Sequence, residues 1–255
     1  MTDDPFGDPR LAALYDADNP AGEDHDYFRR TAGRAGVRRI VDLGCGTGLL
    51  TVTLAGPDRT VLGIDPSRTM LDLAKARPGH DQVIWQYGDA SVLDALLHPG
   101  SVDLVIMSGN TAQHIVGADW HRTLRSVARV LRPGGVLTFE TRNPTARAWE
   151  SWSAENTMAT RDTDHGPLTE WLEITAVTGF DDGNGGQLTF AAHNVFEATG
   201  EHVVFTTVLA FRTRTELTAD LADAGLRIES IAGGWRNEPL TDTSRLLVVT
   251  ATRSG

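Results

Sequence analysis

The sequence predicts an α/β fold, in which a doubly wound, mostly parallel sheet carries helices on both faces and is followed by an antiparallel insert. Up to residue 142, short apolar runs rich in β-branched residues alternate with segments of helical pattern. A glycine-rich turn directly follows the first apolar run. Beyond residue 142, three strand-like runs follow one another with only turns between them, which predicts the three-stranded antiparallel insert.

The first part of the chain contains five predicted strands and four predicted helices. Each strand run is almost entirely apolar, which is typical of a strand buried on both faces of a parallel sheet. The helices show apolar stripes at helical spacing, and Ser67 is a candidate cap for one of them. The strands are expected over 38–43, 60–65, 83–89, 101–110 and 136–142, and the helices over 49–55, 67–77, 91–97 and 118–131.

The second part of the chain contains the insert and the end of the main sheet. Insert strands are expected over 168–180, 187–198 and 202–213, joined by "DDGNGG" and "TGE". A helix over 213–226 and strands over 227–235 and 245–253 then complete the sheet. The predicted organisation is an N-terminal helical cap (1–36), a core (37–142 and 213–255) and a β insert (143–212) that serves as a substrate lid or as a dimer contact.

Composition excludes several classes of function. The chain has 255 residues, a formal net charge of -11 and a pI near 5.1, which argues against a nucleic-acid partner. Its single cysteine, Cys45, excludes an intramolecular disulfide and a zinc site built from several cysteines, and we expect no metal. We find neither a signal peptide nor an apolar run near the roughly 18 residues of a membrane span. A soluble, cytoplasmic protein without a membrane partner is expected.

The stretch "IVDLGCGTGLL" places Gly44, Gly46 and Gly48 at the end of the first strand. Ligands of such sheets bind at the carboxyl ends of the strands, and glycines let a ligand rest on the backbone. Asp65 ends the second strand, where it could accept hydrogen bonds from ribose hydroxyls, and Asp89 follows the third, within reach of an exocyclic amine. Two acids beside the turn favour an adenosine site over a tight turn that binds nothing.

The turn differs from the dinucleotide fingerprint G-x-G-x-x-G, which places pyrophosphate at a helix N-terminus. Here the run is G-C-G-T-G and is preceded by Asp42. An acid at this position suits a cationic ligand better than a phosphate. S-adenosylmethionine, which carries a sulfonium and an ammonium, is therefore the expected cofactor.

The segments "VDLGCGTG", "GIDPS", "QYGDA", "VDLVIMSGN" and "LRPGG", in this order and at these separations, resemble the successive motifs of class I S-adenosylmethionine-dependent methyltransferases. The resemblance covers residues 38–142 well and 213–253 by element order. It implies a Rossmann-like sheet of seven strands, the last of them antiparallel. It also implies a cofactor site made of Asp42, Gly44, Cys45, Gly46, Gly48, Asp65, Pro66, Met70, Asp89, Ala90, Ser108, Gly109 and Asn110.

Within this site, the resemblance assigns the glycine turn to the methionine moiety and Asp65 to the ribose. Met70 or Pro66 would lie against the adenine, and Asp89 with Ala90 would hold its edge. Residues 108–110 would line the passage from the cofactor to the acceptor. The families that methylate adenine or glutamine amides carry an Asn/Asp-Pro-Pro-aromatic motif where this chain has "SGNT", which argues against those acceptors.

The acceptor side is less defined by sequence. Methyl transfer is an in-line displacement, so orientation matters most, and a hydroxyl or ammonium acceptor also needs a base. His114 is the first candidate base and His193 the alternative, and each could instead be an ordinary satisfied histidine. Trp149, Trp152 and Trp171 could pack on an aromatic or cationic acceptor or could form a hydrophobic hinge. Tyr15, Tyr27 and Phe28, in the N-terminal segment, could help cover the bound cofactor or could serve ordinary helix packing.

The sequence therefore predicts a methyltransferase that transfers a methyl group to O or N of a small molecule, with homodimer formation through the insert as a further expectation. One alternative is a non-catalytic S-adenosylmethionine-binding or regulatory protein of the same fold. A nicotinamide-dependent oxidoreductase is a weaker third hypothesis, and it predicts NAD binding.

Overall fold

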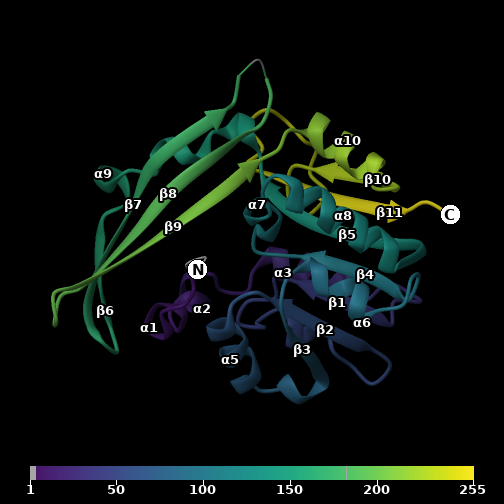
Figure 1. The fold of residues 1–255 in the computed structure, drawn as a ribbon, viewed down its shortest axis with the longest axis horizontal. Coiled ribbons are helices and arrows are strands. Elements are labelled where there is room, and N and C mark those ends of the chain that lie inside the picture. Colours follow the sequence, from purple (N-terminus) through teal and green to yellow (C-terminus); the bar gives the residue numbers. More distant parts are fainter. Residues whose placement is uncertain (1–3, 182) are drawn as a thin grey trace.

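The computed structural model describes residues 4–181 and 183–255, and its main body is a seven-stranded sheet (Figure 1). The strand order is β10-β11-β5-β4-β1-β2-β3. The strands are β1 (Arg39–Leu43), β2 (Thr60–Asp65), β3 (Val83–Tyr87), β4 (Val102–Met107), β5 (Leu131–Arg142), β10 (Leu226–Ala232) and β11 (Leu246–Arg253).

The directions of these strands confirm the predicted doubly wound sheet. β1 pairs in parallel with β2 and β4, and β3 and β5, the next strands on either side, continue the parallel arrangement. β11 lies between β10 and β5 and is antiparallel to both, as expected for the last strand. The strand order reverses between β1 and β4, so a ligand crevice is expected at the carboxyl ends of these two strands.

Helices cover both faces of the sheet, as predicted. On one face, α3 (Glu23–Ala32) and α4 (Thr51–Leu54) contribute Tyr27, Phe28 and Leu54 to a buried cluster with apolar residues of β1, β2 and β4. On the other face, α6 (Leu93–Leu96), α8 (Ala118–Val130) and α10 (Arg214–Asp223) bury Leu93 and Trp120. Burial of these two faces supplies most of the apolar surface removed from water.

Short helical segments complete the chain. α5 (Arg68–Ala76) begins at Ser67, whose hydroxyl accepts a hydrogen bond from the Met70 amide (3.2 Å). The others are α1 (Pro9–Ala12), α2 (Tyr15–Asp18), η1 (His80–Gln82), η2 (Ala90–Val92), α7 (Thr111–His114), η3 (Pro144–Ala146), η4 (Ala148–Ser151) and α9 (Ala154–Thr157). None of the helices in the described parts of the chain is both long and apolar enough to cross a membrane.

The insert is an antiparallel sheet, as predicted, but it has four strands instead of three. Its order is β6 (Ala159–Thr163), β7 (Gly166–Gly179), β8 (Gly186–Phe196) and β9 (Glu201–Phe211). The extra strand, β6, reads "ATRDT" and has no buried residue, so it lacks the apolar alternation by which strands are recognised. β6 is a strand because five of its residues pair with β7 at the edge of the insert, and not because of an apolar pattern.

The base of the insert has its own small core. The Trp149 ring lies 4.5 Å from Phe180 and 4.5 Å from Phe211 (centroid distances), and Leu188 and Leu209 complete the cluster. Trp149 is 5% exposed. The sequence predicts that Trp149 either packs on the acceptor or forms a hydrophobic hinge, and the structure supports hydrophobic packing.

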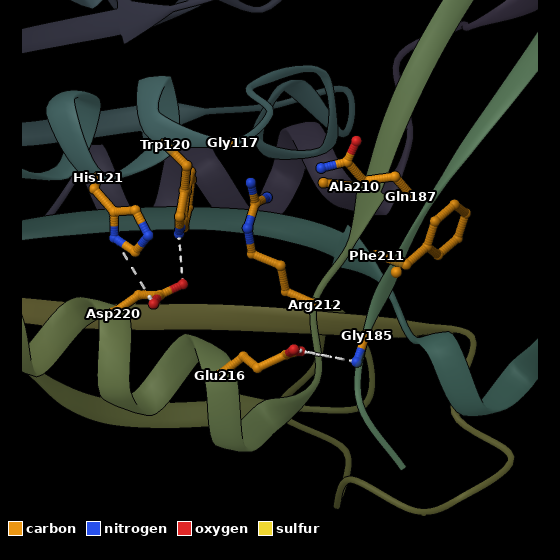
Figure 2. Close-up of a pocket in the computed structure, with 11 residues that line it drawn as sticks. Gly117, Trp120, His121, Gly185, Gln187, Ala210, Phe211, Arg212, Glu216 and Asp220 are labelled. Carbon is orange, nitrogen blue, oxygen red and sulfur yellow. Dashed lines mark hydrogen bonds and ion pairs between the residues drawn. The ribbon is translucent and has the colours of Figure 1, made fainter. Parts of the chain in front are cut away.

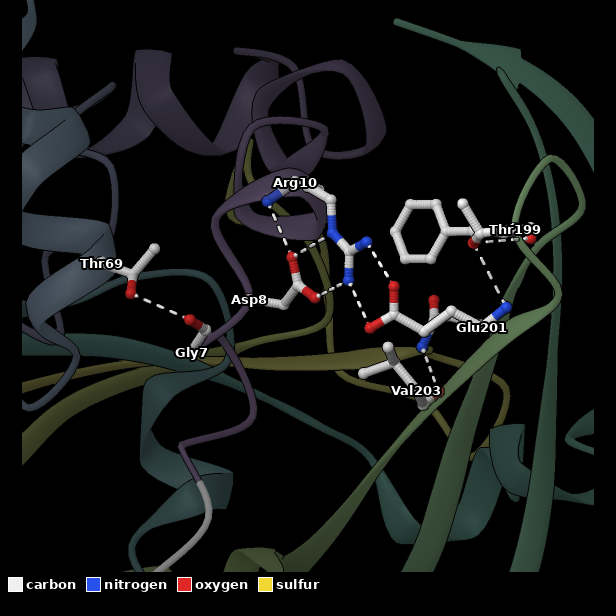
Figure 3. A network of polar contacts seen from close by, with 9 residues as sticks. Gly7, Asp8, Arg10, Thr69, Thr199, Glu201 and Val203 are labelled. Atoms are coloured by element: carbon white, nitrogen blue, oxygen red, sulfur yellow. Dashed lines mark hydrogen bonds and ion pairs between the residues drawn. The ribbon is translucent and has the colours of Figure 1, made fainter. Parts of the chain in front are cut away.

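The N-terminal segment connects the insert with helix α5 (Figure 3). Arg10 donates to Glu201 of β9 (2.6 Å) and its guanidinium lies 3.9 Å from the centre of the Phe196 ring. On the other side, the Thr69 hydroxyl of α5 donates to the Gly7 carbonyl (3.2 Å). The predicted helical cap thus contains α1, α2 and α3, while its first three residues lie outside the described part of the chain.

Candidate cofactor and acceptor site

The glycine turn after β1 has the left-handed backbone that glycine permits. Gly44, Gly46 and Gly48 have φ values of 77°, 53° and 74°. The Gly44 and Cys45 amides both donate to the Ile64 carbonyl of β2, at 2.8 and 3.0 Å. The turn is therefore fixed against the neighbouring strand, at the point where the strand order reverses.

The three glycines have different surroundings. A Cβ at Gly44 would lie 2.4 Å from the Thr111 side chain, and one at Gly48 would lie 2.6 Å from the Trp85 ring. At Gly46 nothing lies within 4 Å of such a Cβ. The first two glycines are thus needed for packing within the chain, and Gly46 is the one whose bare backbone faces open space.

Asp65 is joined to this open backbone. Its Oδ2 accepts a hydrogen bond from the Gly46 amide (2.7 Å), and its Oδ1 accepts one from the Ser67 amide (2.8 Å). The side chain lies at the end of β2, and the residue is only 7% exposed. Burial raises the pKa of Asp65, which the two amide hydrogen bonds partly offset. Each carboxylate oxygen still has a lone pair for a further donor.

Asp42 and Cys45 lie beneath the turn. Asp42 is fully buried, accepts a hydrogen bond from the Thr51 hydroxyl (2.7 Å), and has its pKa raised to about 7 by burial. Because Asp42 is fully buried, a ligand could interact with its charge only at a distance and not by direct contact. Burial likewise raises the pKa of the Cys45 thiol, which keeps it protonated and argues against a nucleophilic role.

A buried acid that the sequence analysis did not single out, Glu140, lies on β5. Its Oε1 accepts a hydrogen bond from the Asn110 amide (2.6 Å), and the residue is 2% exposed. Burial raises the pKa of Glu140 to about 7. Glu140 is the one acid in the apolar run "VLTFETR", the same signal that drew attention to Asp65.

The remaining predicted cofactor residues lie at the ends of β2, β3 and β4. Asp89 caps η2 by accepting from the Ser91 amide (2.8 Å), and Ala90 is buried beside it. Pro66 is exposed, whereas Met70 is 1% exposed and packs in the core. Of these two, only Pro66 offers surface to an adenine ring.

The passage after β4 is formed by Ser108, Gly109 and Asn110. Asn110 has a φ of 59° and lies at the start of α7, directly over Glu140. The Tyr15 hydroxyl would lie 3.5 Å from a Cβ at Gly109. Burial and the charges of Asp65 and Glu140 raise the pKa of Tyr15. The N-terminal segment therefore covers the strand ends.

His114 is the last residue of α7 and its side chain is exposed to solvent. Although part of the His114 side chain is exposed, the protein around it removes water from the ring. This desolvation, together with the positive charge of Arg142, lowers the pKa of His114. Its imidazole is neutral at neutral pH, the state in which it can accept a proton.

His193 belongs to a different part of the molecule. It stacks on Trp171 (ring centroids 4.6 Å apart), and its Nδ1 lies 3.1 Å from His202 Nε2. Its Nε2 lies 3.3 Å from the Glu173 carboxylate. Because side chains alternate along a strand, His193 points away from the face of β8 that carries Leu188 and Phe190. The structure does not bring it together with His114.

A separate pocket lies at the base of the insert (Figure 2). Arg212 crosses it, lies over the Trp120 ring, and donates to the Ala112 carbonyl of α7 (2.9 Å). The acids that line this pocket are already paired. Asp220 accepts from the Trp120 indole (2.9 Å), and Glu216 accepts from the Gly185 amide (3.1 Å). The pocket thus joins the insert to α7, the helix that ends in His114.

The chain is similar to known methyltransferases in sequence. Residues 40–135 match the family described as a methyltransferase domain. The chain is 31% identical over 111 residues to a ubiquinone biosynthesis O-methyltransferase of Bartonella tribocorum, covering 44% of each protein. It is 29% identical over 225 residues to the cypemycin N-terminal methyltransferase of a Streptomyces species, covering 85% of this chain and 83% of that one. The chain spans about half the length of the first curated relatives that it matches.

Two solved structures have a similar fold along nearly the whole chain. An S-adenosylmethionine-dependent methyltransferase of Clostridium acetobutylicum superposes with a TM-score of 0.74 at 16% identity, covering 96% of this chain and 98% of that one. An amino pentose methyltransferase of Micromonospora echinaspora, solved with S-adenosylmethionine bound, superposes with a TM-score of 0.63 at 23% identity, covering 94% and 97%. Residues 40–135 thus match a methyltransferase domain, and the chain as a whole shares its fold with solved S-adenosylmethionine-dependent methyltransferases.

Proposed function

We propose that this protein is an S-adenosylmethionine-dependent methyltransferase that transfers a methyl group to O or N of a small-molecule acceptor. The observation that carries the proposal is the open backbone at Gly46, hydrogen-bonded to the buried carboxylate of Asp65 at the reversal of strand order. The acids around it suit a donor with positive charge. A nucleoside that carries a sulfonium needs open backbone to rest on and carboxylate oxygens that can still accept hydrogen bonds, and this site offers both.

The relatives support a small acceptor. The matched proteins act, by their names, in ubiquinone biosynthesis, on the N-terminus of cypemycin and on an amino pentose, so both O- and N-methylation occur among them. The net charge of -11 is consistent with an acceptor that is not a polyanion.

In the proposed complex, Asp65 holds the ribose, Pro66 and Asp89 border the adenine, and the turn at Gly46 supports the methionine moiety. When bound, S-adenosylmethionine supplies a methyl carbon that is electrophilic because it is attached to a sulfonium. The chain's own part is to orient the acceptor in line with that carbon, which typically contributes about 7–11 kcal/mol to lowering such a barrier. The remaining predicted cofactor residues, Asp42, Gly44, Cys45, Gly48, Met70 and Ala90, shape the turn and the core behind this site.

We further propose that the N-terminal helices α1 and α2 and the insert together close the site. Tyr15 lies over the strand ends, and Arg10 and Asp18 pair with Glu201 and Arg161 of the insert. Closure of this kind would exclude water from the acceptor. The division into cap, core and insert, the cytoplasmic location and homodimer formation through the insert stay predictions.

The test has two steps. Calorimetry should first show that S-adenosylhomocysteine binds and that NAD does not. Transfer of a labelled methyl group from S-adenosylmethionine to a panel of amines, phenols and sugar alcohols should then yield a methylated product. Cofactor binding without any product would favour a non-catalytic binding protein, and NAD binding in its place would reject the proposal.

His114 provides a prediction about the chemical step. If His114 accepts the acceptor's proton, His114→Gln should lower kcat by about 10²- to 10⁴-fold and leave the affinity for S-adenosylhomocysteine unchanged. Because the pKa of His114 is depressed, the wild-type rate should stay nearly constant between about pH 6 and pH 8, where an ordinary histidine would titrate.

The matched control is His121→Gln. His121 lies on the neighbouring helix α8 and contacts Asp220 in the pocket of Figure 2 (3.8 Å). Equal, small losses of kcat in the two variants would show that His114 has no catalytic part.

A further inference from the structure

Two buried oxygen acceptors at the carboxyl ends of β4 and β5 have no hydrogen-bond partner within the described residues. They are Glu140 Oε2 and Asn110 Oδ1, and both atoms are inaccessible to solvent. They belong to residues that are already joined, since the Asn110 amide donates to Glu140 Oε1 (2.6 Å). Buried acceptors without donors are rare in folded proteins because leaving them unpaired costs free energy.

The cation nearest to Glu140 along β5 is already engaged elsewhere. Arg142 donates to Gln113 Oε1 (2.8 Å), and its guanidinium lies 5.3 Å from the centre of the Trp152 ring. The other titratable groups that influence or face Glu140 are Asp24 and Tyr15, and neither is a cation. The charge of Arg142 therefore acts on Glu140 only at a distance, and the two acceptor oxygens are left without a donor.

The arrangement of these oxygens selects among cations. A guanidinium binds a carboxylate best through both oxygens at once, but Oε1 of Glu140 already shares one of its lone pairs with the Asn110 amide, and only Oε2 has no donor. A metal ion needs more ligands, and no group of three or more histidine, cysteine or acidic residues that could hold one occurs in the described ranges. A primary or secondary ammonium needs only a few acceptors, which Glu140 Oε2 and Asn110 Oδ1 can provide.

We infer that Glu140 and Asn110 form a binding site for an alkylammonium group, an inference that rests on the proposed methyltransferase function. Two molecules in the proposed reaction can carry such a group. One is the donor, through its α-ammonium, and the other is an amine acceptor. In the second case the site selects amines over alcohols and makes the protein an N-methyltransferase.

The experiment compares wild-type protein with Glu140→Gln. Glutamine keeps an oxygen for the Asn110 amide but removes the charge, so the thermal midpoint should be equal or higher. Glu197→Gln, a charge removal on the exposed end of the insert, is the control. Each protein is titrated with S-adenosylhomocysteine and with its analogue that lacks the α-amino group. Each is then saturated with S-adenosylhomocysteine and tested by saturation-transfer NMR with cyclohexylammonium and with neutral cyclohexanol.

If the donor's ammonium occupies the site, Glu140→Gln should weaken S-adenosylhomocysteine binding by about tenfold or more and leave the deaminated analogue unaffected. If an acceptor amine occupies it, donor affinity should not change. Cyclohexylammonium should then bind the wild type but not Glu140→Gln, and neutral cyclohexanol should not bind the wild type. Either result supports the inference. Equal behaviour of wild type and Glu140→Gln in all four titrations would overturn it while leaving the proposed function intact. Failure of the wild type to bind S-adenosylhomocysteine would instead reject the proposed function, and this inference with it.

Discussion

Replacing Asp65 by alanine is expected to weaken S-adenosylhomocysteine binding by roughly 30- to 700-fold. In the proposed complex, Asp65 accepts two hydrogen bonds from the ribose, and each bond to a charged group contributes about 1.5–3 kcal/mol. Even about 2–4 kcal/mol in total corresponds to that range of dissociation constants. Calorimetric titration of both proteins measures the change directly.

The alanine variant also loses a structural contact, so it needs a matched control. Asp65 accepts from the Gly46 and Ser67 amides, and their loss will lower the free energy of unfolding. Asp103 is its counterpart at the other end of the sheet, where its Oδ2 accepts from the Arg38 and Arg39 amides at 2.9 and 2.8 Å. Asp103→Ala, which also loses the ion pair with Arg132 (2.6 Å), should lose at least as much stability and keep full affinity. If both variants bind as the wild type does, the ribose assignment is wrong.

The main sheet could be predicted from the sequence because its strands are buried on both faces. A strand such as β4, whose residues Leu104 to Met107 have no contact with water, must be apolar throughout, and this leaves an unambiguous pattern. The edge strand β6 has no such constraint. Its residues are polar and its position is set by pairing with β7 and by Arg161, which binds Asp18 and Glu170.

The site could be predicted in part, for a related reason. Acids that end apolar strands, such as Asp65, stand out against their neighbours, and Glu140 gives the same signal inside β5. What the sequence did not show was which glycine faces open space, because Thr111 and Trp85 approach Gly44 and Gly48 from distant parts of the chain. His193 was a weaker prediction because a histidine in a β strand carries no information about which face it occupies.

The acids at the strand ends share one property that sequence alone could not supply. Burial raises the pKa values of Asp42, Asp65 and Glu140 together, so the chain holds several carboxyl groups in a region where their charges are costly. A positively charged ligand would lower these pKa values again by stabilising the ionised forms. Binding of the donor or of an amine acceptor is therefore expected to release protons from these carboxyl groups near neutral pH.

Gly46→Val is the second variant for which we expect a large effect, with S-adenosylhomocysteine affinity falling by up to roughly 100-fold. The new side chain would fill the space beside Asp65 that is open in the structure, and steric overlap of this kind costs up to about 3 kcal/mol. The left-handed backbone at Gly46 adds a cost to folding of roughly 1–2 kcal/mol for any L-residue.

Gly36→Val separates these two effects. Gly36 has a φ of 84° and nothing within 4 Å of a Cβ, and it lies before β1, at the opposite end of the strand from the turn. Both variants should therefore lose similar free energy of unfolding, measured by denaturant titration, because in each a valine must adopt a left-handed backbone. Only Gly46→Val should lose cofactor affinity. Parallel loss of affinity in both would mean that the backbone conformation, and not the space in front of Gly46, governs binding.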